Sequence, residues 1–171
     1  VAPIRYLPEP KLWVLETERT SYVLGVNERG ELQHVYWGRK LTRDVDLQPA
    51  HSRPELASFD STETMTNGEY QGWGARLYSE PCLKIARADG VRDLVLKYVS
   101  HEIRGDTLEI RVQDIQDDFF VRLTYRVFPA TDIIRKQAEI QNQTAQAVGV
   151  ESAQSGVWYV PRGDDYRLSY L

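Results

Sequence analysis

Apolar and polar residues alternate through most of this chain, and a period of two is typical of β-strands with one buried face. In residues 107–113 every second side chain is apolar, and residues 121–127 repeat the pattern. The most helix-like segment, 132–143, contains three isoleucines and lies among strand-like neighbours, so we expect a strand there as well. The sequence therefore predicts an all-β fold with little or no helix.

Short turn sequences separate these runs and suit antiparallel hairpins. They lie at 28–31, 88–90, 104–106 and 116–118. Reading outward from the turns, we expect strands near 12–18, 20–27, 31–37, 82–87, 92–103, 106–115, 119–128, 132–142 and 147–158. Long strands after residue 91 are typical of large twisted sheets that stack face to face, so residues 1–171 are predicted to form one antiparallel β-sandwich domain.

Composition narrows the classes of partner. The formal charge is −4 and the isoelectric point is near 5.4, so the chain lacks the basic surface that nucleic-acid binding requires. Its apolar runs are far shorter than the roughly 20 residues of a membrane-spanning helix, so we expect no contact with a membrane. Cys82 is the only cysteine, which excludes an internal disulfide, suggests a small buried residue and favours a cytoplasmic protein.

The sequence offers no pattern for a bound metal or cofactor. Its three histidines, His34, His51 and His101, lie on separate segments without metal-ligand spacing. No phosphate-binding loop, dinucleotide fingerprint or nucleophile elbow accompanies them. We therefore expect neither a metal nor a cofactor.

Two segments depart from the strand pattern. Residues 41–70 are polar, contain Pro49 and Pro54 and show no sustained period, and long loops of this kind are frequently functional. We expect this loop to contact another part of the protein or a partner. Residues 166–171 read as the start of a strand without a closing turn, so the natural polypeptide is expected to continue beyond them.

Acidic residues cluster at Asp114, Asp117 and Asp118, and paired carboxylates are the working groups of most glycoside hydrolases. Asp117 and Asp118 lie where a hairpin turn is expected, however, and aspartate favours turns through hydrogen bonds to its own backbone. We therefore assign them to the turn, with a calcium site at 114–118 as the alternative.

Trp73 lies between two glycines, which lower strand propensity and allow close backbone approach. An indole face stacks on the apolar face of a sugar ring, and nearby Glu69 and Arg76 carry groups that bind hydroxyls. The alternative is that Trp73 caps an edge of the core. Trp37 and Trp158 lie on or beside strand patterns, so we expect both to pack in the core.

Several segments resemble the amino-terminal domain of family 36 α-galactosidases, and the resemblance extends over nearly the whole chain. Residues 32–41, LQHVYWGRKL, resemble a strand-ending Tyr-Trp-Gly signature of that domain. Residues 68–83, GEYQGWGARLYSEPCL, are similar to a stretch in which relatives carry Glu-Tyr-Pro, a glycine-rich turn and an arginine; Gln71 replaces the proline here. The long strands after residue 91 and the ending GDDYRLSYL also resemble that domain.

The resemblance implies a galactose mutarotase-like β-supersandwich that precedes a (β/α)8 catalytic barrel. It implies a retaining glycosidase of terminal α-galactosyl groups, as in melibiose or raffinose, with one aspartate as nucleophile and another as acid/base. Both aspartates would lie outside this sequence, so no catalytic residue is assigned. The resemblance also implies barrel packing, a homo-oligomer, and a substrate-binding role for Trp73 with Arg76 and Tyr70 beside it.

Two other functions stay open at this point. The first is a carbohydrate-binding module that holds sugar on exposed aromatic side chains without help from a barrel. The second is an aldose-epimerase-like enzyme, since mutarotases share the supersandwich architecture. Such an enzyme needs a histidine and a glutamate together in a cleft, and the scattered histidines argue against it.

Overall fold

The computed structural model of the chain describes residues 2–52, 66–74, 80–160, 163 and 166–167. This part consists of β-strands with short 3-10 helices, among them η1 (Asp44–Asp46) and η3 (Pro129–Thr131). None of the helices in the described part is long and apolar enough to cross a membrane.

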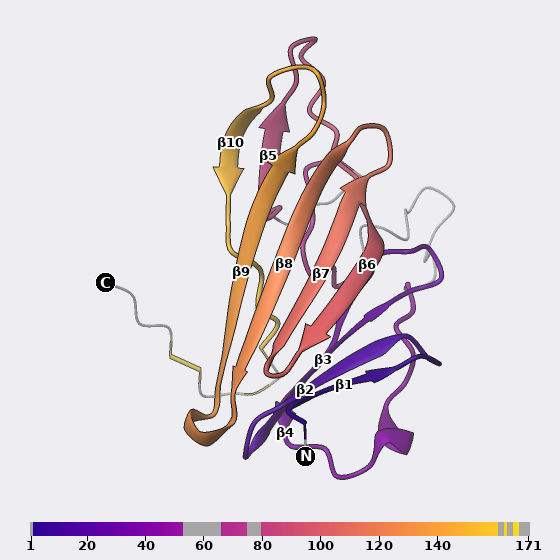
Figure 1. The fold of residues 1–171 in the computed structure, drawn as a ribbon, viewed down its shortest axis with the longest axis vertical. Coiled ribbons are helices and arrows are strands. Elements are labelled where there is room, and N and C mark those ends of the chain that lie inside the picture. Colours follow the sequence, from indigo (N-terminus) through magenta and orange to yellow (C-terminus); the bar gives the residue numbers. More distant parts are fainter. Residues whose placement is uncertain (1, 53–65, 75–79, 161–162, 164–165, 168–171) are drawn as a thin grey trace.

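The strands of the described part form two four-stranded sheets and one two-stranded sheet, all with antiparallel pairing (Figure 1). The first sheet, in the order β1-β2-β3-β4, contains β1 (Ile4–Leu7), β2 (Leu12–Glu16), β3 (Thr20–Val26) and β4 (Leu32–Arg39). The second, in the order β6-β7-β8-β9, contains β6 (Leu96–Arg104), β7 (Thr107–Asp114), β8 (Phe119–Phe128) and β9 (Ile133–Asn142). The third pairs β5 (Leu83–Ala86) with β10 (Gly149–Ala153).

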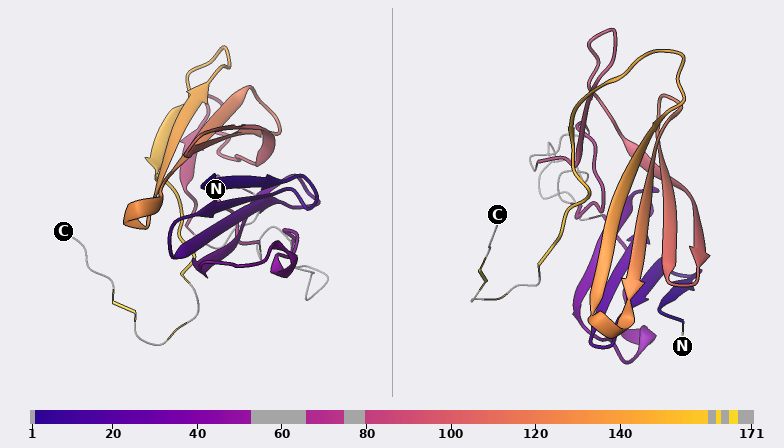
Figure 2. Two further views of the ribbon diagram at one scale, coloured as in Figure 1. Left: turned by 60° about the horizontal axis from the view of Figure 1, so that its bottom comes forward. Right: turned by 60° about the vertical axis from the view of Figure 1, so that its left-hand side comes forward.

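The two four-stranded sheets face each other, and the main core lies between them (Figure 2). Leu108, Ile110 and Val112 of β7 are buried, as the alternation in that segment predicts. Their counterparts on β8 lie on the same face, and β2, β3 and β4 supply the opposite wall. The predicted all-β sandwich is therefore confirmed, and its interior is formed by the inward face of each strand.

The expected strands differ from the observed ones in three places. Residues 92–95 precede β6 without joining a sheet, since the Leu94 N–H pairs with a loop carbonyl instead of a strand. Residues 154–158 also lie outside any strand, because β10 ends at Ala153. The short strand β1 was not predicted, since four residues between two prolines carry too little alternation to show a period.

The predicted hairpin turns at 28–31, 104–106 and 116–118 join neighbouring strands, whereas the one at 88–90 does not, because β5 pairs with β10 and residues 92–95 join no sheet. Gly30 has φ +75° between β3 and β4, and Gly105 has φ +61° between β6 and β7. Glycine adopts these positive angles without the steric cost that a Cβ would add. The turn chemistry therefore fixes the antiparallel connections of both large sheets.

Residues 154–160, called the strap below, run back along the molecule after β10 (Figure 1). The carbonyl of Gln154 accepts a hydrogen bond from the Tyr70 hydroxyl at 3.0 Å. Further along, the Tyr159 hydroxyl donates to the Gly68 carbonyl at 3.1 Å. The strap is therefore fastened to the loop that precedes β5.

Candidate functional site

Trp73 lies in the described segment 66–74, called the Trp73 loop below. Its backbone N–H donates to the Leu83 carbonyl at 3.0 Å, and its own carbonyl accepts the Leu94 N–H at 2.7 Å. The first bond joins Trp73 to the start of β5, and the second joins it to the segment before β6. The backbone at Trp73 is therefore fixed on both sides.

The flanking glycines make this close approach possible. A Cβ on Gly72 would lie 2.4 Å from the backbone oxygen of Leu94, well inside van der Waals contact. Gly74 has φ +145°, a conformation that residues with side chains rarely adopt. The close approach that the sequence predicts from the two glycines is confirmed, and its partner is the backbone of Leu94.

The indole of Trp73 is 42% exposed and lies beside two cations. The guanidinium carbon of Arg92 is 4.7 Å from the ring centroid, and Lys84 Nζ is 5.0 Å from it. Arg92 forms a salt bridge with Glu151, and Lys84 forms one of 2.5 Å with Glu80. Cation–π contacts restrain the ring, while the charged groups around it are donors and acceptors for hydroxyls. The indole is therefore partly covered by two paired cations and partly exposed.

The structure places Tyr70, predicted to lie beside Trp73 as a substrate contact, in the core. Tyr70 is 4% exposed, its hydroxyl is engaged by the strap, and burial raises the pKa of that hydroxyl. Arg76 lies outside the described residues. The roles of Tyr70, Arg76 and Trp73 in substrate binding therefore stay predictions, and of the two described residues Trp73 is the exposed one.

Glu69, at the start of the same loop, is fully buried and joins strands of both large sheets. The Tyr22 hydroxyl of β3 donates to Glu69 Oε1 at 2.7 Å, and the Tyr125 hydroxyl of β8 donates to the same oxygen at 2.8 Å. Lys136 Nζ of β9 lies 2.5 Å from this oxygen, with 2% of the Lys136 side chain exposed. A buried carboxylate requires such partners, because an uncompensated charge in the interior costs several kcal/mol.

The two tyrosines act as permanent donors to this carboxylate. Burial, followed by the charge of Glu69, raises the pKa of Tyr22 well above its usual value. The same two causes, in the same order, raise the pKa of Tyr125. Both hydroxyls therefore stay protonated at any physiological pH, and the hydrogen bonds to Glu69 persist.

His34 of β4 stands next to this cluster. Its Nδ1 lies 3.9 Å from Glu69 Oε2 and has no hydrogen-bond partner among the described residues. The ring is 7% exposed and stacks on Tyr159 of the strap, with centroids 5.2 Å apart. Burial lowers the pKa of His34, which favours the neutral imidazole.

The fold thus brings together a histidine and a glutamate that the sequence separates by more than thirty residues. General acid–base catalysis requires that such groups reach the substrate. Glu69 is wholly withdrawn from solvent and the strap covers His34, so this pair lies in the packed interior and does not line a cleft. The substrate of an aldose-epimerase-like reaction therefore cannot reach Glu69 and His34 in this conformation.

Sequence reasoning missed Lys136, although a signal for it was present. Ile134, Ala138 and Ile140 of β9 pack against the core, and Lys136 has the same parity in the strand. A lysine on the inward face of an alternating strand requires a buried acid as its partner. The pattern does not say which acid, and only the fold shows that it is Glu69.

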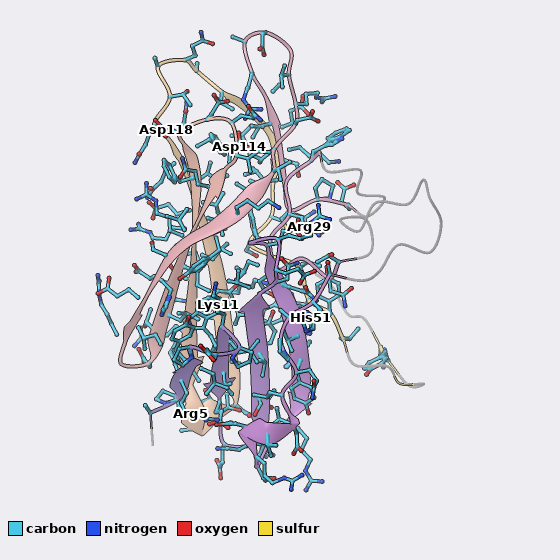
Figure 3. All side chains as sticks on the ribbon, turned by 90° about the vertical axis from the view of Figure 1, so that its right-hand side faces the viewer. Arg5, Lys11, Arg29, His51, Asp114 and Asp118 are labelled. Atoms are coloured by element: carbon cyan, nitrogen blue, oxygen red, sulfur yellow. The ribbon has the colours of Figure 1, made fainter. Side chains whose placement is uncertain are left out.

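The acidic cluster forms a salt-bridge network at the end of the molecule opposite Arg5 (Figure 3). Asp114 lies 2.6 Å and Asp117 2.7 Å from nitrogens of Arg87, while Asp118 is exposed in the turn between β7 and β8. The turn interpretation of Asp117 and Asp118 agrees with this placement. Within the described ranges, no group of three or more histidine, cysteine or acidic side chains is arranged to hold a metal ion.

Trp37 and Trp158 were both expected in the core; Trp37 is half-buried and packs against it, whereas Trp158 lies at the surface. Their ring centroids are 5.3 Å apart; Trp37 packs partly against the core, while Trp158 is 41% exposed. With Ile133, Ile134 and neighbouring polar residues they line a hollow of about 400 Å³ close to η3. This cluster is called the tryptophan hollow below.

Residues 30–171 match the family described as the glycosyl hydrolase family 36 N-terminal domain. The chain belongs to this family. The resemblance drawn from the sequence motifs is therefore confirmed. This family 36 domain is 27% identical over 176 residues to the bifunctional alpha-galactosidase/sucrose kinase AgaSK of Mediterraneibacter gnavus, an alignment that covers 88% of this chain and 19% of AgaSK.

Solved structures show the same architecture. The galactosidase domain of AgaSK matches with a TM-score of 0.74 and 28% identity, over 88% of the family 36 domain and 24% of that chain. A variant of the alpha-galactosidase AgaA from Geobacillus stearothermophilus, solved in complex with raffinose, matches in fold with a TM-score of 0.70 and 22% identity. That match covers 84% of this chain and 24% of the AgaA chain. The domain thus spans about a fifth to a quarter of the length of these relatives.

Proposed function

We propose that this family 36 domain is the non-catalytic amino-terminal domain of a retaining α-galactosidase that removes terminal galactosyl groups from sugars such as raffinose. The proposal depends on the match to AgaSK over 88% of the chain, together with the small share of AgaSK that the match covers. The reacting carboxylates would then lie in a catalytic barrel that follows this domain. The sealed position of Glu69 and His34 supports this division of labour.

Within such an enzyme, Trp73 would contribute an aromatic wall to the sugar-binding pocket. The observation that supports this role is an indole that is 42% exposed, held by backbone hydrogen bonds on both sides and surrounded by charged groups. A sugar ring stacks on such a face through its C–H groups while its hydroxyls bind neighbouring charges. The aromatic face supplies binding energy, and the chemistry belongs to the barrel.

The tryptophan hollow would form part of the surface against which the barrel packs. Ile133 is 53% and Trp158 41% exposed, and large apolar side chains gathered at one place mark an interaction surface. Apolar clusters of this kind favour a lasting interface between domains over a transient contact. A second copy of the enzyme is the other occupant that the same surface would accept.

Activity of the complete polypeptide and of residues 1–171 tests the proposal. We expect the complete polypeptide to release galactose from raffinose with retained anomeric configuration, followed by NMR, and we expect residues 1–171 to release none. Absence of galactose release by the complete polypeptide would refute the proposed function. Turnover by residues 1–171 would refute the non-catalytic role.

Substitution of Trp73 tests its part in the proposal. In the complete polypeptide, Trp73→Ala should raise KM for raffinose about tenfold with little change in kcat. Stacking of one ring on an aromatic side chain contributes about 1–3 kcal/mol to binding. Trp73→Phe retains a flat ring and should stay close to the wild type. If residues 1–171 bind galactose in titration calorimetry and Trp73→Ala abolishes the heat, the domain is a carbohydrate-binding module in its own right.

A further inference from the structure

The salt bridge between Lys136 and Glu69 lies at the meeting point of the Trp73 loop, the strap and both large sheets. Lys136 Nζ, besides its 2.5 Å contact with the Glu69 carboxylate, donates to the backbone carbonyl of Glu69 at 3.3 Å. It also donates to the carbonyl of Val157 in the strap at 3.0 Å. The Lys136 ammonium group therefore contacts the side chain and the backbone of Glu69 in the loop. It also contacts the backbone of Val157 in the strap.

The strap approaches this lysine closely along its length. Lys136 Nζ lies 5.3 Å from the ring centroid of Trp158, a cation–π contact. A Cβ on Gly156 would lie 2.5 Å from Lys136 Cε, so the strap backbone rests on the lysine stem. The strap backbone and the Trp158 ring therefore both lie against the Lys136 side chain.

The loop is anchored to the same point at its start. The Glu69 N–H donates to the Leu32 carbonyl at 2.9 Å, and the carboxylate is held by the two buried tyrosines. Two further hydrogen bonds, from Tyr70 and Tyr159, join the loop and the strap directly. Trp73 follows Glu69 by four residues, so the two residues lie within about 14 Å of each other along the chain.

We infer that Lys136 and Glu69 are a positioning pair that makes the Trp73 loop and the strap move as one unit, so that a displacement of the strap shifts Trp73. In the family 36 enzyme of the proposed function, on which this consequence rests, the strap lies between β10 and the barrel. Docking of the barrel against the strap would thus set the place of the Trp73 ring in the sugar pocket. Neither residue contacts the substrate, and both act through Trp73.

Hydrogen exchange on residues 1–171 tests the coupling without any assumption about activity. Lys136→Met leaves Glu69 without its counter-charge and threatens folding, so the matched variant is Glu69→Gln with Lys136→Met, which removes both charges together. We expect the amides of Trp73 and Gln154 to lose protection by on the order of tenfold, while amides of β7 change little. An equal loss throughout the domain, or unchanged protection at Trp73, would overturn the inference.

The control is an ion pair that also includes a residue of β9 but touches neither the Trp73 loop nor the strap. Arg122 and Glu139 form a salt bridge between β8 and β9, with 41% and 47% of their side chains exposed. The paired variant Arg122→Met with Glu139→Gln should leave exchange at Trp73 and Gln154 as in the wild type. Loss of protection there as well would show that any change on β9 loosens the loop.

Kinetics of the complete polypeptide provide the second measurement. The paired Glu69→Gln and Lys136→Met variant should raise KM for raffinose with kcat unchanged, and Trp73→Ala added to it should raise KM by less than it does in the wild type. Full additivity of the two changes would overturn the positioning role. A complete polypeptide without galactosidase activity would refute the proposed function alone, since the exchange experiment still decides the coupling.

Discussion

The carboxylate of Asp114 and the guanidinium of Arg87 form a salt bridge of 2.6 Å in which 1% of the Asp114 side chain is exposed. The second oxygen of the same carboxylate accepts the Val95 N–H at 3.1 Å. This pair therefore joins the turn after β5 to the end of β7 and to the segment before β6. The backbone of Trp73 bonds to Leu83 at the start of β5 and to Leu94 next to Val95, so the salt bridge and Trp73 share the segment before β6.

Asp114→Asn should destabilise the domain by about 3 kcal/mol, because it leaves the guanidinium of Arg87 with less compensation in a largely buried place. Arg87 retains Asp117, which limits the loss. Urea unfolding followed by tryptophan fluorescence measures the change. An Asp114→Asn variant as stable as the wild type would contradict this role for the salt bridge.

Asp118→Asn is the matched control for this prediction. Asp118 is exposed in the turn between β7 and β8, so its substitution should change the free energy of unfolding by less than about 0.5 kcal/mol. The pair of variants also examines the calcium alternative. If calcium raised the melting temperature of the wild type and failed to do so for Asp114→Asn, the acidic turn would be a metal site after all.

Gly72→Ala should destabilise the domain by about 1–3 kcal/mol, because the new methyl group would overlap the backbone of Leu94. The strain falls on the hydrogen bond between Leu94 and Trp73, so the fluorescence of Trp73 should shift as well. Chemical denaturation and emission spectra of the folded variant measure the two effects. Unchanged stability would contradict the close contact, because the loop would then accommodate the added methyl group beside Leu94.

Gly149→Ala is the corresponding control. A Cβ at Gly149 would lie 3.5 Å from the carbonyl oxygen of Ala86, an ordinary contact, and β10 tolerates a side chain there. The change in stability should stay within about 0.5 kcal/mol. A loss equal to that of Gly72→Ala would assign the effect to glycine replacement in general and not to the contact with Leu94.

The strands could be predicted because each one carries its own local signal. The segment that forms β7 alternates apolar and polar residues over its whole length, and turn residues bound it on both sides. In β9 the three isoleucines and the strand-like neighbours were enough to predict a strand despite a helix-like composition. The strap shows the limit of this reasoning: it continues the chain after β10 with strand-like residues, but it pairs with no strand in the part of the chain that the structure describes.

The candidate site could be predicted only in part. Glycines on both sides of Trp73 indicate a close backbone approach, whereas the partner, Leu94, lies twenty-one residues away and follows from the fold alone. The parity of Lys136 in its strand predicts a buried acid. Its identity as Glu69, sixty-seven residues earlier, depends on how the two sheets stack, which no local pattern encodes.

Protonation of His34 should make the domain less stable in acid. Burial lowers the pKa of folded His34 below its usual 6.5, the Lys136 charge acts in the same direction, and the charge of Glu69 opposes them. Just below pH 6.5 the unfolded chain therefore binds more protons than the folded domain. The contribution of His34 to the free energy of unfolding is fully present above that pH and falls as the pH drops. His34 contributes at most about 1.4 kcal/mol per pH unit, and urea unfolding between pH 5 and 8 measures it.

His34→Gln removes this titration and should flatten the dependence of stability on pH below 6.5, whatever its effect at neutral pH. Burial lowers the pKa of His101 too, so His101→Gln should remove a separate part of the dependence of stability on pH. The two histidines lie on different strands with different neighbours, so the shares should add in the double variant. A His34→Gln variant with the full wild-type slope would mean that His34 accepts its proton as readily folded as unfolded.

Ile133→Thr distinguishes a docking surface at the tryptophan hollow from an ordinary exposed patch. Ile133 is 53% exposed, so in residues 1–171 the change should cost less than about 0.5 kcal/mol. In the complete polypeptide a covered hollow would bury the new hydroxyl without a partner, which costs about 1–3 kcal/mol and lowers the first calorimetric transition by about 2–4 °C. Val150→Thr is the control, because Val150 is 51% exposed on β10, away from the hollow. If both variants shift that transition equally, the tryptophan hollow is exposed to solvent in the complete polypeptide. If Ile133→Thr shifts it only at high protein concentration, a second copy and not the barrel covers the hollow.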